Sequence, residues 1–140
     1  MRDDNCIFCK IAGGCIPSNT LYEDENFLVI LDIAPAAKGH AIAIAKNHFR
    51  DLLQAEPSAL AAALPAVARV ADAMKKALSC DGINILQNNG EAAGQSVFHL
   101  HFHIIPRRQG DGLTIPWKTL SYEDGEAEAL ASAIRSELEK

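Results

Sequence analysis

Three of the five histidines in the chain lie within one short stretch, Phe98-His99-Leu100-His101-Phe102-His103-Ile104-Ile105. Because successive side chains of a β-strand point to opposite faces, this alternation predicts three imidazoles on one face and Phe98, Leu100, Phe102 and Ile104 on the other. Imidazoles two residues apart on a strand are roughly 6.6–7 Å apart. One tetrahedral metal ion would reach all three only if the strand curved. We therefore expect three separate roles for the three histidines.

A neutral imidazole can attack phosphorus, and a covalent intermediate divides one difficult displacement into two easier ones. The nucleophile needs a partner at its other ring nitrogen to fix its tautomer. Neighbouring histidines or hydroxyls can then stabilise phosphoryl oxygens or protonate a leaving group. Two other interpretations use the same residues, namely a metal-binding face and a solvated strand edge.

The composition predicts a single globular domain over residues 1–140, because 49% hydrophobic and 22% charged residues at this length suit one chain with its own core. A formal net charge of −5 argues against a broad basic surface, so we expect no polymeric nucleic acid as a partner. The apolar runs are too short to span a membrane, and the polar start does not resemble a secretory signal. We therefore expect a cytoplasmic protein with no membrane partner.

The pattern of apolar residues predicts five strands, at residues 20–23, 27–32, 40–45, 83–86 and 97–106. A long helix is predicted over residues 57–79, with Pro57 in its first turn, a bend or break at Pro65 and a stop at Asp81-Gly82. Its expected apolar face consists of Leu60, Leu64, Val67, Ala71, Met74 and Leu78. After a loop containing Pro116-Trp117, a weaker final helix is marked by Leu130, Ile134 and Leu138. This order predicts an α+β fold in which an antiparallel five-stranded sheet, a meander, carries the helices on one side.

Cys6 and Cys9 have a two-residue spacing that lets one metal ion bind both thiolates, although such a pair also serves redox chemistry. A structural zinc needs four Cys or His ligands, and His48 and His99 are available to complete the set. The alternative is two buried thiols and a surface His48. Cys15 and Cys80 have no such spacing, and we interpret them as structural.

Residues 94–105 closely resemble the signature of the histidine triad (HIT) family of nucleotide hydrolases and transferases. Asp32-Ile33-Ala34-Pro35 and Gly39-His40 are also similar to the family, and the resemblance extends over residues 6–107. It implies a HIT-like fold with an N-terminal arm, residues 1–16, and a C-terminal loop and helix, residues 111–140. It also implies a homodimer in which the two sheets are joined.

The resemblance implies that His101 attacks the α-phosphate of a purine nucleotide conjugate and forms a nucleotidyl-histidine, which water then cleaves. His103 would contact the phosphate and the departing group, and His40 would orient the histidines. Ser96 would hydrogen-bond the phosphate or leaving group, where the alternative is an ordinary turn hydroxyl. The other substrate-binding residues would be Asp32 at the ribose, Asn88 at the phosphate, and Ile33, Gly94, Gln95 and Val97. Asn89 is the alternative to Asn88, and a turn carboxylate is the alternative for Asp32.

Bacterial HIT proteins of similar sequence imply a structural zinc held by Cys6, Cys9, His48 and His99. We expect an enzyme that hydrolyses an adenosine phosphoramidate or a dinucleoside polyphosphate. Gly94-Gln95-Ser96 is similar to the phosphoramidase branch, whereas residues 104–107 are similar to the dinucleoside polyphosphate hydrolases, so both substrates stay open. The alternatives are a non-catalytic nucleotide-binding or partner-binding module, and a metalloenzyme with a catalytic metal on the histidine-bearing strand.

Overall fold

The computed structural model describes residues 2–115 and 117–140, so Met1 and Pro116 of the predicted domain and loop lie outside the described residues. The elements, in chain order, are α1 (Ile7–Ala12), β1 (Thr20–Glu23), β2 (Phe27–Leu31), β3 (Ala41–Ala45), α2 (Pro57–Leu78), β4 (Gly82–Leu86), β5 (His101–Arg107) and α3 (Glu126–Leu138). Short 3₁₀ helices lie at Leu52–Gln54 and Glu91–Ala93. All the predicted strands and both main helices are confirmed, and α1 is an additional helix.

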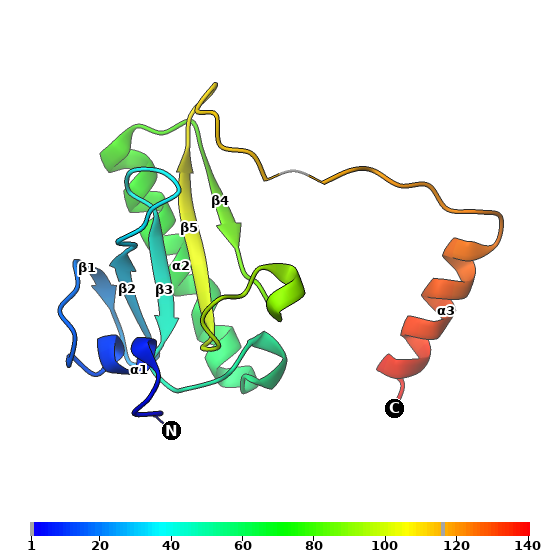
Figure 1. The fold of residues 1–140 in the computed structure, drawn as a ribbon, viewed down its shortest axis with the longest axis horizontal. Helices are drawn as coiled ribbons and strands as arrows, with labels where there is room; N and C mark the ends of the chain where they lie inside the picture. The colour runs from blue at the N-terminus through cyan, green and yellow to red at the C-terminus, as the bar shows by residue number, and fades with distance from the viewer. Residues whose placement is uncertain (1, 116) are drawn as a thin grey trace.

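The strands form one antiparallel sheet in the order β1-β2-β3-β5-β4 (Figure 1). The first three strands make the predicted meander. The chain then crosses through α2 to the far edge, and β5 returns between β3 and β4. In this register Ile44 lies opposite His101 and Ile42 lies opposite His103. The histidine-bearing strand therefore lies inside the sheet.

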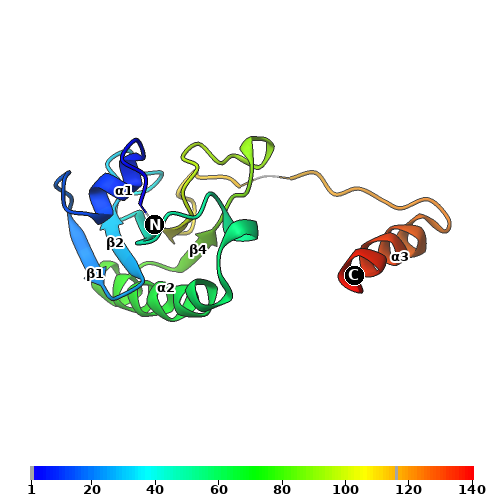
Figure 2. The same ribbon diagram turned by 90° about the horizontal axis from the view of Figure 1, so that it is seen from below.

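The two faces of the sheet are covered by different helices. Figure 2 shows α2 on one side of the sheet and the short α1 on the other. Phe27 and Val29 pack toward α2, whereas Leu28 and Ile30 pack with Phe8 of α1. The expectation of helices on one side is wrong, because β2 and β3 are apolar on both faces and each face needs a cover.

Helix α2 begins at Pro57 as predicted, but its buried face differs from the predicted stripe. The buried residues are Ala63, Ala66, Val67, Val70 and Met74. Leu64 is 63% exposed and Leu78 lies at the rim. The small alanines, rather than the leucines, let the helix approach the sheet closely.

Helix α2 ends within one residue of the predicted range 57–79, but it does not break at Pro65 and its stop is not Asp81-Gly82. The helix continues through Pro65, which lies on its exposed side, where water can bond the carbonyl that loses its donor. The helix ends at Ser79, which has a left-handed conformation with φ 49°, and Gly82 already begins β4.

The strand predicted over residues 97–106 begins only at His101, because residues 97–99 form a bend. Leu100, Phe102 and Ile104 are buried against α2 as predicted. Phe98 does not join them. It is 40% exposed, and the Arg50 guanidinium carbon lies 5.1 Å from its ring centre. The bend turns His99 away from the regular strand and toward the N-terminal segment.

Beyond β5 the chain leaves the domain as an extended arm that ends in α3 (Figure 1). Arg107 anchors the start of this arm by donating hydrogen bonds to Asp111, Asn84 and the Leu113 carbonyl. No described helix combines the length and the apolar composition that a membrane crossing requires.

Candidate active site

His40, His101 and His103 meet on the face of the sheet opposite α2. His101 and His103 share that face of β5, and their ring centres are 5.0 Å apart. His40 comes from the residue before β3, and its ring centre is 5.1 Å from that of His103. The preceding Gly39 has φ +99°, a backbone conformation that strains other residues, and a Cβ there would also displace a Leu78 methyl carbon 2.5 Å away.

The tautomer of His101 is fixed by the backbone. Its Nδ1–H donates to the His99 carbonyl at 2.6 Å, because a carbonyl oxygen can only accept. Nε2 therefore carries the lone pair. Burial lowers the pKa of His101, although the His99 carbonyl and the Asp32 carboxylate favour the charged form. This imidazole is a neutral potential nucleophile near pH 7.

His40 and His103 form a directed chain of hydrogen bonds. The Ala36 backbone N–H donates to His40 Nδ1 at 3.0 Å, so the His40 proton lies on Nε2 and is donated to His103 Nδ1 at 2.9 Å. Burial lowers the pKa of His40. Burial, together with the neighbouring His101 and His40, lowers the pKa of His103 to about 4. In the neutral pair, the remaining proton of His103 lies on its Nε2.

Asp32 follows β2, and the structure shows its role as a turn carboxylate, whereas its role at the ribose stays a prediction. Its Oδ1 accepts the Ala34 N–H at 2.8 Å, which makes it a turn carboxylate, while Oδ2 lies 3.7 Å from His40 Nε2. Asp32, His40 and His103 bring possible metal-ligand atoms within 4.8 Å of one another. However, His40 Nε2 is protonated in this hydrogen-bond pattern and would have to lose that proton to bind a metal. Ile33 is 97% exposed beside Asp32.

In the loop after β4, Asn88 and Asn89 differ in whether their side chains already have hydrogen-bond partners. Asn89 Oδ1 accepts from the Leu52 N–H at 2.8 Å, and its amide also pairs with the Gln87 side chain. The Asn88 side chain lies against Gly94, where a Cβ would be 3.4 Å from Asn88 Nδ2. Within the described residues, the hydrogen bonds leave the Asn88 amide without a protein partner. Asn88 is therefore the asparagine whose amide is available to a ligand.

Gln95 has a structural task that its position in the sequence does not reveal. Its side-chain amide donates to the Arg50 and Val97 carbonyls at 2.8 and 3.2 Å, and its Oε1 accepts from the Gly90 N–H at 2.8 Å. These bonds hold the loop together, and the role of Gln95 in binding phosphate stays a prediction.

Ser96 is exposed after this loop, and Val97 is half-buried beside it. Both line a pocket of about 620 Å³ together with Arg50 and Phe98. Cys6 and His48 line the same pocket. The contact of the Ser96 hydroxyl with a phosphate or leaving group stays a prediction.

Cys6, Cys9, His48 and His99 bring their ligand atoms within 4.8 Å of one another and could bind a metal ion. Cys6 is the N-cap of α1 and Cys9 lies in its first turn, so the short helix directs both thiols toward the sheet. His99 Nε2–H donates to the Ala45 carbonyl at 2.6 Å, which leaves the Nδ1 lone pair facing the other three residues.

These distances suit a tetrahedral ion. His99 Nδ1 lies 3.2 Å from His48 Nδ1 and 3.3 and 3.5 Å from the sulfurs of Cys6 and Cys9. Around a tetrahedral zinc, nitrogen ligands would be about 3.3 Å apart, and nitrogen and sulfur about 3.6 Å apart. Burial raises the pKa of the Cys9 thiol and lowers that of His99 to about 4. A bound cation would lower the pKa of the Cys9 thiol again, and the low pKa of His99 keeps its imidazole neutral and able to bind the cation.

Phe8 is a site residue that the sequence analysis missed. Its ring contacts both His99 and His101 edge-on, at centre distances of 6.0 and 4.9 Å. Phe8 lies between Cys6 and Cys9 in the sequence. If both cysteines bind a metal ion beside His99, Phe8 must also lie close to the histidines. That inference needs α1, which the sequence analysis did not predict.

A family model described as the HIT domain matches residues 14–110, and this chain belongs to that family. Among its relatives, "Protein hit" of Bacillus subtilis is 43% identical over 96% of this chain and 95% of its own length. The adenosine 5'-monophosphoramidase of Schizosaccharomyces pombe is 41% identical over 96% of this chain and 98% of its own. The adenylylsulfatase of Arabidopsis thaliana is 42% identical over 96% of this chain and 70% of its own.

Solved structures confirm the fold. A HIT family member from Bacillus subtilis superposes with a TM-score of 0.89 at 43% identity, covering 95% of this chain and 96% of that one. A Zn-bound histidine triad family protein from Mycobacterium smegmatis gives a TM-score of 0.75 at 41% identity, covering 94% and 96%.

Proposed function

We propose that this protein hydrolyses adenosine 5'-phosphoramidate, or a closely related adenylyl conjugate, through a covalent intermediate on His101. The observation that carries this proposal is the hydrogen bond from His101 Nδ1 to the His99 carbonyl at 2.6 Å, which leaves the Nε2 lone pair free for attack. The names of the relatives from Schizosaccharomyces pombe and Arabidopsis thaliana support an adenylyl substrate.

In the first step, His101 Nε2 attacks the α-phosphorus and the bond from phosphorus to the leaving nitrogen breaks. The leaving nitrogen keeps the electron pair and takes a proton from the imidazolium form of His103. A phosphate anion against His103 favours that form, since a nearby opposite charge raises the pKa. Water then attacks phosphorus and gives a proton to His103, while the electron pair of the His101–phosphorus bond returns to Nε2. The products are adenosine monophosphate and ammonia.

The remaining residues would bind the substrate. Asp32 Oδ2 would accept from ribose hydroxyls beside the exposed Ile33. Asn88, the Gly94 backbone and the Ser96 hydroxyl would hold the phosphate and leaving group, with Val97 beside them, since neutral donors can stabilise an anion in an acidic protein. Gln95 would act indirectly, by holding the loop that carries them.

A phosphoramidate is favoured over a dinucleoside polyphosphate because the distinctive Arg107 is already engaged. Its guanidinium bonds Asp111 at 2.8 and 2.9 Å and Asn84 at 2.7 Å, so it is not available to a polyphosphate chain. The discriminating measurement is the ratio of kcat/KM for the two substrates. We expect the phosphoramidate to have the higher value.

We further propose zinc as the ion of the Cys6, Cys9, His48 and His99 site. Zinc would supply a structural crosslink between α1, His48 and the start of the histidine strand, with no part in the chemistry. Two thiolates and two imidazoles are ligands typical of structural zinc.

We also propose a homodimer of single HIT domains in which the β4 edges join. Strand β4 pairs regularly with β5 but has an unpaired outer edge, whereas β1 is irregular between Thr20 and Tyr22. The exposed Leu64 of α2 would be covered in the dimer. A cytoplasmic location completes the proposal, since thiol ligands need a reducing compartment.

The decisive experiment replaces His101 with asparagine, whose amide can still donate to the His99 carbonyl but offers no nucleophile. We expect kcat to fall by about 10³-fold or more, with zinc content, melting temperature and nucleotide binding retained. In the wild type, a rapid quench into alkaline denaturant, in which a phosphorus–nitrogen bond to histidine is stable, should trap label on protein from an adenylyl-labelled substrate. The His101→Asn variant should trap none. Wild-type turnover by His101→Asn would contradict the proposal.

A further inference from the structure

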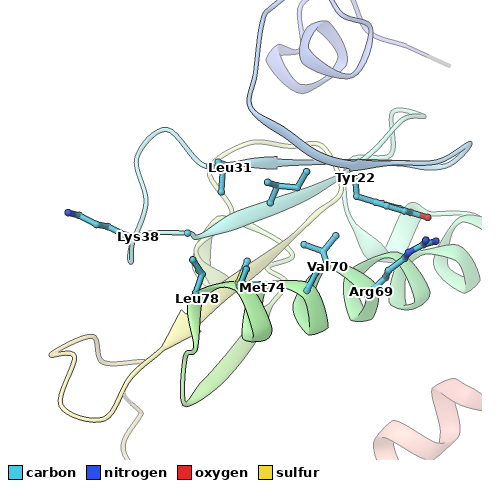
Figure 3. A pocket seen from close by; sticks show the side chains of 11 residues that line it. Tyr22, Leu31, Lys38, Arg69, Val70, Met74 and Leu78 are labelled. Carbon is cyan, nitrogen blue, oxygen red and sulfur yellow. The ribbon is translucent and has the colours of Figure 1, made fainter.

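Among the described residues, two apolar surfaces lie outside both the candidate active site and the candidate metal site. The first is a groove of about 740 Å³ between α2 and the β1–β2 edge. Its apolar lining includes Leu21, Leu31, Val70, Met74, Ala77 and Leu78 (Figure 3). We call it the α2–β1 groove. It lies on the other face of the sheet from His101, so the proposed reaction leaves it without a role.

The second surface is one side of α3. Leu130, Ile134 and Leu138 recur every four residues, and they are 48%, 62% and 81% exposed. Residues at this spacing line one face of a helix. A helix of 13 residues is marginal in water without tertiary packing, so α3 needs a surface to cover this stripe.

The charges of the two surfaces are complementary. Lys38 lies at one end of the α2–β1 groove and Arg69 at the other (Figure 3). Helix α3 carries three glutamates, Glu126, Glu128 and Glu137, and one arginine, Arg135, so it is net acidic. Two of these glutamates form exposed ion pairs, Glu128 with Arg135 at 3.1 Å and Glu137 with Lys140 at 2.5 Å. Acidic groups flanking an apolar stripe suit an apolar groove with basic ends.

The direction of the arm indicates which copy provides the groove. The arm leaves past β4 and carries α3 beyond that edge of the sheet, whereas the groove opens at the β1 side of the same domain (Figure 1). Seen from below, α3 lies at about the level of α2 rather than that of α1 (Figure 2). A second copy placed beyond β4 would present its own α2 at this level.

We propose that α3 of one copy docks its Leu130, Ile134 and Leu138 stripe into the α2–β1 groove of a second copy, and that the exchange is reciprocal. A reciprocal exchange closes as a two-fold dimer and leaves no free groove or helix. It buries the apolar stripe and brings the glutamates of α3 near Lys38 and Arg69.

Disulfide crosslinking tests this arrangement in the full chain. Exposed Cys15 is first replaced by serine, and two differently tagged chains are co-expressed, one with Ala77→Cys in the groove and one with Ala131→Cys beside the α3 stripe. Under oxidised glutathione we expect a disulfide-linked product that contains both tags. The matched control uses Ser136→Cys, on the opposite side of α3, where crosslinking should fall to background.

Equal crosslinking from positions 131 and 136, or none from position 131, would overturn the proposal. Docking within one copy is tested with a chain that carries both Ala77→Cys and Ala131→Cys. This chain is mixed with an excess of the Cys15→Ser chain, so that its usual partner offers no introduced cysteine. A product of monomer mass that holds an internal disulfide would also overturn it. Adding Ile134→Glu to the Ala131→Cys chain should abolish the crosslink and reduce hydrogen-exchange protection of α3.

Phosphoramidate hydrolysis is measured on the same preparations. Absence of the crosslink with turnover intact would refute the helix exchange alone, whereas a crosslinked protein without turnover would count against the proposed function alone.

Discussion

The Nδ1–H of His101 donates to the backbone carbonyl of His99 at 2.6 Å, so one residue serves two sites with different atoms. The His99 side chain belongs to the metal site, where its Nε2–H bonds the Ala45 carbonyl and its Nδ1 faces the cysteines. The His99 carbonyl belongs to the histidine cluster, where it selects the nucleophilic tautomer. Under the proposed function, a metal bound by these four residues would support the orientation of His101 without contacting the substrate.

Replacing Cys9 with serine should remove bound zinc and destabilise the fold. Loss of one buried ligand leaves the His99 and His48 nitrogens facing each other without a shared cation. We expect a loss of about 3 kcal/mol, which lowers Tm by about 10 °C. Differential scanning calorimetry and metal analysis provide the measurement. Cys15→Ser, which removes an exposed thiol outside the site, should change neither value, and a chelator should destabilise the wild type but not Cys9→Ser.

Two substitutions of His40 separate the effects of its two hydrogen bonds, one with the Ala36 N–H and one with His103. In His40→Gln the amide can still donate to His103, whereas in His40→Asn the oxygen can still accept from the Ala36 N–H but nothing reaches His103. If the bond to His103 matters for proton transfer, kcat should fall by about 10- to 100-fold in His40→Asn and less in His40→Gln. The reverse order would show that the turn at Ala36 is the important contact.

The strands were predictable because their apolar residues follow a simple period, and the histidine cluster because its alternation is unbroken. The start of β5 was not predictable in this way. The alternation continues through Phe98 and His99, but the backbone bends there so that His99 can face the cysteines of α1. That bend depends on contacts with residues distant in the sequence. The alternation of apolar residues along one strand carries no information about such contacts.

The same limit applies to the loop before β5. Gln95 and Asn89 were judged by their place in a motif, yet their amides bond the backbone of Arg50 and Leu52, about forty residues earlier. Helix α1 was missed for a different reason. It has only six residues and its N-cap, Cys6, makes no side-chain capping bond, so it shows neither an apolar period nor a capping signal.

Asn88 and Asn89 should give opposite phenotypes when each is replaced with alanine. Asn89→Ala removes the acceptor of the Leu52 N–H and should cost about 1–3 kcal/mol of stability, seen as a lower Tm with little change in KM. Asn88→Ala removes an amide that has no protein partner, so Tm should stay unchanged while KM for the phosphoramidate rises about tenfold. Steady-state kinetics and thermal melts on both variants would reveal a reversed assignment.

The depressed pKa of His103 predicts that the protein loses stability as the pH falls from about 6.5 to about 4. Burial and the neighbouring His101 and His40 lower this pKa to about 4 in the folded chain, whereas Asp32 opposes the shift. The unfolded chain, with an ordinary value of 6.5, binds more protons throughout that interval, so the free energy of unfolding decreases as the pH falls. The contribution is on the order of 2–3 kcal/mol and is complete below about pH 4, where both states are protonated. His103→Asn keeps an acceptor for the His40 proton but does not titrate. Denaturant melts of the zinc-loaded proteins should therefore show a shallower pH dependence for this variant, and identical slopes would refute the assignment.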